Sequence, residues 1–148
     1  MIGVAMIIMG AALGALVFLP WFIATGFPGV HLSGVGGAGE LWTVAALAAV
    51  IVGCGVLVAA RRGARAAALV SIAAATLAAV LCLSAILFIP AHVVIEQLGM
   101  LRGVDLPRET GPVAITPAAY LAMTAAALSG LLGLLALSAA PRPGMPGP

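Results

Sequence analysis

The residues that could do chemistry are few, and they gather in two stretches of the chain. All four acids and both histidines fall within residues 31–40 and 92–109: His31, Glu40, His92, Glu96, Asp105 and Glu109. His92 and Glu96 are four residues apart, a spacing that places both on one side of a helix. Together with His31 and Glu40 they form a candidate metal site, because imidazole and carboxylate groups are ligands for zinc and copper.

The same residues also have a simpler interpretation as solvated polar groups. His92 and Glu96 fit the exposed face of a short helix. Glu40 fits the first turn of a helix, where a carboxylate interacts favourably with the helix dipole. Spacing across two loops does not fix whether side chains converge, so the sequence favours the solvated interpretation and predicts no cofactor.

Motifs of known enzyme classes are missing from the sequence. It has no serine–histidine arrangement, no glycine-rich phosphate loop after a strand, and no pair of carboxylates at a defined spacing. A membrane enzyme that modifies lipids, with His92 and Glu96 as acid and base, is therefore the least favoured alternative.

Composition indicates an integral membrane protein with a single domain. Of the 148 residues, 64% are hydrophobic and 7% are charged, and the mean hydropathy is +1.30. A soluble domain carries about a quarter charged residues. The chain is too short for a helical bundle with a separate soluble module.

Four apolar runs are long enough to cross a hydrocarbon core of about 30 Å, which takes about 20 helical residues. They cover residues 2–22, 41–60, 66–90 and 117–140. The predicted fold is an all-α, four-helix transmembrane bundle with outer loops at 23–40 and 91–116 and a disordered cytoplasmic tail at 141–148. The outer loops are expected to form a cap, with a short helix at 91–102 and short strands near residues 22–25, 30–33 and 112–115.

Small residues recur every four positions along these runs, a pattern that lets transmembrane helices approach closely. The predicted packing residues are Gly10, Gly14, Ala49, Gly53, Ala122, Ala126 and Gly130. Cys54 and Cys82 lie inside apolar runs and are interpreted as small packing residues. Gly63 is expected to end the second helix in a left-handed conformation.

Arg61, Arg62 and Arg65 predict the orientation of the chain. Arginines beside transmembrane segments stay on the cytoplasmic side, so both termini are expected inside, in a multi-pass protein of the plasma membrane. Anionic lipid headgroups account for these charges. Binding of nucleic acid is not expected, since three arginines in one tight turn do not form a basic stripe and aromatic residues do not interleave with them.

All seven aromatic residues fall at or near the predicted outer ends of the spans, or in the first outer loop. Tryptophan and tyrosine favour the interface between membrane and water. This one-sided distribution predicts an ordered outer face that binds a partner. Its candidate interface residues are Trp21, Phe22, Phe27, Trp42 and Tyr120.

Short motifs in both outer loops resemble a known set of proteins. They are LPWF at 19–22, LSG at 32–34, GELW at 39–42, GP at 111–112 and PAAYL at 117–121. The chain resembles small four-span membrane proteins common in actinobacteria, although its 117–119 segment departs from their glycine-rich version. The resemblance implies the four-span architecture and no assigned chemistry. The layout is also similar to that of claudins, whose paired loop cysteines this chain lacks.

The spans predict a non-catalytic function because their interiors hold no acidic or basic group. A coupled transporter needs an ionisable site near the midplane. The polar residues there are Ser71, Thr76, Ser84, Thr124 and Ser129, which helix packing explains. We expect an accessory or scaffold subunit that binds a membrane-protein partner or forms a homo-oligomer. A small oligomeric channel or passive transporter is the alternative.

Overall fold

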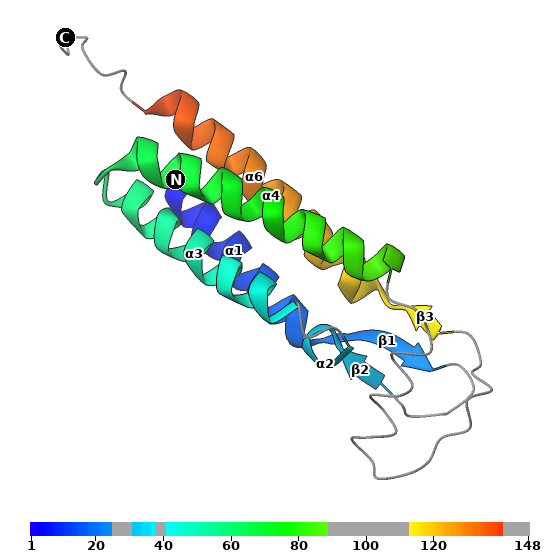
Figure 1. Ribbon diagram of the computed structural model, residues 1–148. Helices are drawn as coiled ribbons and strands as arrows, with labels where there is room; N and C mark the ends of the chain where they lie inside the picture. The colour runs from blue at the N-terminus through cyan, green and yellow to red at the C-terminus, as the bar shows by residue number, and fades with distance from the viewer. Residues whose placement is uncertain (25–30, 38–40, 89–112, 141–148) are drawn as a thin grey trace, which may run out of the picture.

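The computed structural model describes residues 1–24, 31–37, 41–88 and 113–140, and within them four long helices form an elongated bundle (Figure 1). The helices are α1 (Ile2–Phe18), α3 (Leu41–Ala59), α4 (Ala64–Phe88) and α6 (Pro117–Ala139). By length and composition α3, α4 and α6 can each cross a membrane, and α1 is a shorter apolar helix of 17 residues. The chain is therefore a helical membrane protein.

The four helices close into a ring in which each packs against two neighbours. Helix α1 packs on α3, α3 on α4, α4 on α6, and α6 returns to α1. Neighbouring helices run antiparallel, since Gly3 near the start of α1 meets Ala59 at the end of α3. Likewise, Gly133 late in α6 meets Ala68 early in α4.

Helix α1 ends at Phe18, four residues before the expected end of the first span at residue 22. The next residue, Leu19, is extended, with φ −74° and ψ 161°. Pro20 explains the break, because its ring disfavours a helical conformation at the preceding residue. The expected span 2–22 is corrected accordingly, and its last residues form a strand.

A three-stranded antiparallel sheet lies at one end of the bundle, here called the sheet end (Figure 1). Its strands are β1 (Pro20–Ala24), β2 (His31–Ser33) and β3 (Val113–Ile115), in the order β2-β1-β3. Ile23 of β1 is opposite His31 on one side and Ala114 on the other. The predicted hairpin and the predicted third strand are thus both present. Within the expected outer loop 23–40, one helical turn also forms, α2 (Gly34–Gly37).

The opposite end of the bundle is closed by the turn between α3 and α4, and Arg61, not Gly63, terminates α3. Arg61 has φ 55°. Its N–H donates to Val58 O at 3.1 Å, and the Arg62 N–H donates to Leu57 O at 3.0 Å. These two bonds define a Schellman motif with arginine at the left-handed position that glycine usually occupies. Gly63 follows, also with positive φ, 57°.

Small residues allow near-contact between α1 and α3. A Cβ added to Gly3 would lie 2.6 Å from Gly55 O, and one added to Gly55 would lie 2.9 Å from Gly3 O. Gly10 packs against Val52 and Ala48, and Gly14 contacts Ala48. This backbone proximity is the arrangement by which small residues favour helix association in lipid.

The same pattern of small residues brings α4 and α6 together. Ala122 and Ala126 are fully buried. A Cβ built on Gly130 would lie 3.7 Å from the Ala75 Cβ, an ordinary van der Waals distance.

Two residues that the sequence predicted to pack inside the bundle lie outside its contacts. Ala49 is exposed, and so is Gly53, whose added Cβ would meet no atom within 4 Å. Helix α3 instead turns Ala48 and Gly55 toward α1. The expectation failed because α3 has two rows of small residues, and spacing alone does not say which row faces inward.

Candidate functional site

The sheet is joined to the bundle by hydrogen bonds at the start of β1. The Gly34 N–H donates to Leu19 O at 3.2 Å, and the Thr116 N–H donates to Trp21 O at 2.8 Å. The Thr116 hydroxyl donates to Pro20 O, across 96 residues of sequence. Thr116 is the N-cap of α6, but its side chain makes no capping bond. It links α6 to the sheet instead.

Trp21, in strand β1, is a core residue. It is fully buried, and its indole N–H donates to Leu16 O at 2.8 Å. Gly34 lies against the ring, since a Cβ there would be 2.8 Å from Trp21 Cε2. Phe22 is also buried, 3% exposed. The prediction that both rings form a partner surface is therefore wrong for the described chain: burial removes large apolar rings from water, and the indole N–H has found its partner inside.

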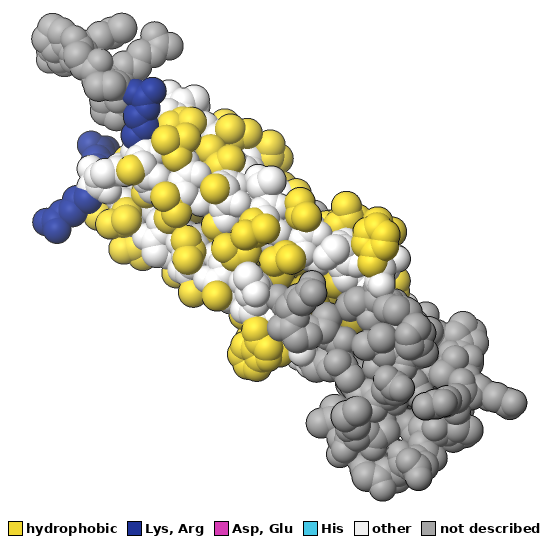
Figure 2. All heavy atoms as spheres, viewed as in Figure 1, with side chains coloured by type: hydrophobic (Ala, Val, Ile, Leu, Met, Phe, Trp, Pro, Cys, Tyr) yellow, Lys and Arg dark blue, Asp and Glu magenta, His cyan; other side chains and the backbone are white. Residues whose placement is uncertain are grey.

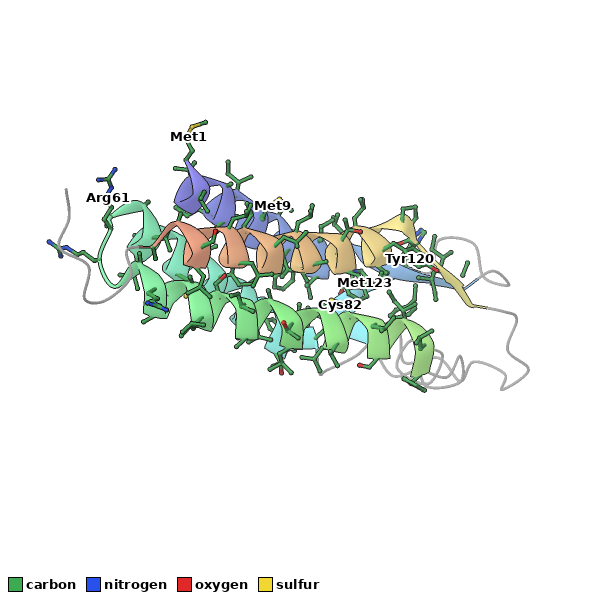
Figure 3. The ribbon with its side chains drawn as sticks, turned by 90° about the horizontal axis from the view of Figure 1, so that it is seen from above. Met1, Met9, Arg61, Cys82, Tyr120 and Met123 are labelled. Atoms are coloured by element: carbon green, nitrogen blue, oxygen red, sulfur yellow. The ribbon has the colours of Figure 1, made fainter. Side chains whose placement is uncertain are left out.

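Other rings form an exposed aromatic belt at the sheet end. It consists of Phe18, Trp42, Phe88 and Tyr120, one from each long helix, and all four are about half exposed or more. Phe18 and Trp42 pack edge to face, with ring centroids 5.6 Å apart and an interplanar angle of 76°. Figure 3 shows Tyr120 at this end and Arg61 at the other. Of the predicted interface residues, Trp42 and Tyr120 thus remain exposed.

The candidate metal ligands are only partly described. His31 is exposed at the start of strand β2, on the edge of the sheet. Glu40, His92, Glu96 and the predicted interface residue Phe27 lie outside the described residues, as do the expected helix at 91–102 and the tail at 141–148. Within 1–24, 31–37, 41–88 and 113–140 no group of three or more histidine, cysteine or acidic side chains gathers.

Most hydroxyl groups of the helices are satisfied by their own helix. Ser129 is fully buried and donates to Ala125 O at 2.8 Å, and Thr76 donates to Ile72 O at 2.9 Å. Ser71 differs: it is fully buried, and its hydroxyl has no hydrogen-bond partner in the described part of the chain. Cys54 and Cys82 are buried free thiols in separate core clusters, as their positions in the sequence predicted.

The arginine end of the bundle is defined by Arg61, Arg62 and Arg65, all of them exposed. Figure 2 shows basic side chains at one end of a face that is otherwise mostly hydrophobic. The described chain is therefore polarised, with guanidinium groups at one end and aromatic rings with a sheet at the other.

Comparison of the chain with protein-family models, with curated proteins and with solved structures finds no match in any of the three. The functional proposal therefore depends on the geometry of the two ends of the bundle alone.

Sequence reasoning missed the contact of Thr116 with Pro20 because no local pattern marks a bond between residues so far apart. The sequence did mark Ser71 as a polar residue inside a span, but spacing does not tell whether its hydroxyl finds a partner.

Proposed function

We propose that this protein is a non-catalytic subunit of the plasma membrane, an accessory or scaffold protein that binds a membrane-protein partner at its outer face. It crosses the bilayer four times, and both termini are cytoplasmic. The observation that carries the proposal is the hydrogen-bonded sheet at one end of a closely packed bundle, with four exposed rings at the same end of the long helices.

The fourth crossing is α1, and its contacts with α3 support it. Gly3 lies against Ala59 at one end of the pair, and Phe18 lies against Trp42 at the other. The two helices therefore span the same depth. Seventeen residues extend about 26 Å, which is at the short limit for a transmembrane helix.

The proposed orientation follows from the two polar ends. From Trp42 to Arg61, α3 covers about 28 Å along its axis, close to the thickness of the hydrocarbon core. The belt fits one membrane interface, and the arginine end fits the cytoplasmic one, where positive residues are retained. This puts the sheet outside the cell.

A scaffold function agrees with the packing of the helical bundle and with the attachment of the sheet to it. The bundle core consists largely of alanine, with glycines where the helices approach most closely, an arrangement suited to a rigid support. Hydrogen bonds of the Trp21 indole and the Thr116 hydroxyl hold the three-stranded sheet on that support. Rigid presentation lowers the entropy that a binding surface loses on association.

Co-purification tests the proposal. Full-length tagged protein, extracted in mild detergent from its native membrane, should retain a larger membrane complex that mass spectrometry identifies. The double variant Trp42→Ala/Tyr120→Ala should reduce retention at least tenfold. Leu131→Ala is the matched control, since Leu131 is equally exposed on α6 but away from the belt. Isolation as a lone monomer, unaffected by the variants, would reject the scaffold function.

A small oligomeric channel is the second candidate, favoured by the outward row of small residues on α3. Ala46, Ala49 and Gly53 are exposed in the described chain, and such rows favour helix–helix contact in lipid. Cross-linking of Gly53→Cys between copies, together with solute flux in liposomes, would support this function. If neither cross-linking between copies nor solute flux is found in a preparation that retains the partner complex, the channel function is rejected and the scaffold function is retained.

A further inference from the structure

The turn between α3 and α4 places three guanidinium groups where the chain reverses. Arg61 holds the left-handed position of the Schellman motif, with φ 55°. Glycine adopts that conformation without cost, whereas a residue with a Cβ does not. The chain thus has a strained arginine where a neutral glycine would stabilise the turn. A functional constraint on the side chain is a reason for such strain to persist.

Helix α4 begins three residues after this arginine, at Ala64, within the same charged turn. The Ala67 N–H donates to Gly63 O at 3.0 Å, so Gly63 is the residue before the first turn. Gly63 has no side chain to cap that turn. Arg65 is exposed on the same first turn, which adds its charge to the positive end of the helix dipole.

None of the residues that the structure describes has a carboxylate side chain that could neutralise these arginines. All four acids fall in residues 38–40 and 89–112, outside the described ranges. Helix α3 separates the arginine end from Leu41 by about 28 Å, well beyond the screening length at physiological ionic strength. The guanidinium donors of the described turn are therefore available to an anion from outside the protein.

We propose that Arg61, Arg62 and Arg65 bind the phosphodiester headgroup of an anionic phospholipid. Guanidinium groups donate paired hydrogen bonds that match phosphate oxygens. A soluble phosphate offers the same oxygens, but the neighbouring surface favours a lipid. Exposed apolar side chains begin within about one turn of the arginines, namely Val56, Leu57, Leu69 and Val70. They can contact the acyl chains while the arginines hold the phosphate.

The inference rests on the bundle lying in a bilayer, as proposed above, and not on the partner at the sheet end. Failure of the co-purification experiment would leave it standing. Loss of lipid binding would likewise leave the scaffold function standing.

Lipid binding to the full-length protein tests the proposal. Protein in neutral detergent is titrated with phosphatidylglycerol, phosphatidylcholine or inorganic phosphate, and bound molecules are counted by native mass spectrometry. Phosphatidylglycerol should bind more tightly than phosphatidylcholine. Each guanidinium removed should weaken that binding about fivefold, so Arg62→Gln/Arg65→Gln should lose about 25-fold. Equal binding of the two lipids, or equal competition by inorganic phosphate alone, would overturn the proposal.

Arg61→Gly separates lipid binding from folding. It removes the guanidinium and relieves the left-handed strain, so the midpoint of thermal unfolding in lipid-free detergent should rise while affinity for phosphatidylglycerol falls about fivefold. Arg108→Gln is the control, which changes the net charge equally at another place in the sequence. A fall in affinity of the same size in the control would show general charge attraction and overturn the site.

Discussion

Trp21 shows how one residue can be misjudged when its neighbours in space are unknown. By sequence it belongs to an aromatic group at the end of a span, where membrane interfaces collect tryptophan. In the structure its ring is fully buried and its indole N–H is bonded to Leu16 O. Trp42, of the same residue type, is 59% exposed. The difference comes from neighbours in space, since Gly34, distant in the sequence, lies against the Trp21 ring.

Replacing Trp21 by alanine should lower the free energy of unfolding by about 3–5 kcal/mol, because a large buried ring leaves a cavity. Trp21→Phe keeps most of the apolar volume and should cost less. The measurement is unfolding by denaturing detergent in mixed micelles. Trp42→Ala is the control and should cost less than about 1.5 kcal/mol, the value of an aromatic pair. Equal losses at both positions would contradict the assignment of Trp21 to the core.

Gly53 and Gly55 form a matched pair on α3 for testing close packing. Gly55→Ala puts a Cβ 2.9 Å from Gly3 O and should lower the free energy of unfolding by about 1–3 kcal/mol through overpacking. Gly53→Ala meets no atom within 4 Å and should raise it by up to about 1 kcal/mol through helix propensity. The same unfolding assay measures both. A destabilising Gly53→Ala would show that this face packs against something.

At the scale of elements, β1 is the strand on which the sheet end depends. It follows α1 after one extended residue, pairs with β2 and β3, and accepts both hydrogen bonds from Thr116. An isolated hairpin is only marginally stable in water. Attachment to two helices therefore explains how such short strands persist.

Thr116→Val keeps the shape of the side chain and removes its hydroxyl, which donates to Pro20 O. The loss should destabilise the fold by about 1 kcal/mol, the usual net value of one hydrogen bond, or more if the carbonyl is left unpaired. Thr116→Ser should restore the bond. Hydrogen exchange of the β1 amides measures the local effect, and unchanged protection in Thr116→Val would show that the backbone bond to Trp21 O suffices.

At the scale of the whole molecule, the separation of charge from rings gives the bundle a direction. Helix α3 (Leu41–Ala59) runs from the belt to the arginine end, and α4 (Ala64–Phe88) runs back to the belt. In a bilayer these two ends occupy opposite interfaces. The proposed topology follows from that polarity alone.

Thiol labelling in intact cells tests the orientation. His31→Cys should react with a membrane-impermeant maleimide from outside, and Arg62→Cys should react only after permeabilisation. Both positions are exposed, whereas the native Cys54 and Cys82 are buried. The wild-type chain is the control for background labelling. The reverse pattern of accessibility would invert the topology and with it the outward-facing sheet.

The sequence by itself determined what depends on local chemistry. Long apolar runs require helices, since backbone groups in lipid must be paired within the segment. Turn residues between short segments predicted the strands, and the arginine cluster predicted the charged end.

Only the tertiary structure decided what depends on residues distant in the sequence. Ala48 and Ala49 are adjacent and identical, yet only Ala48 is buried, because the rotation of α3 is set by its partners. Trp21 is core and Trp42 is surface for the same reason. Composition determines which medium a chain enters, and contacts between distant segments determine which side of each helix faces that medium.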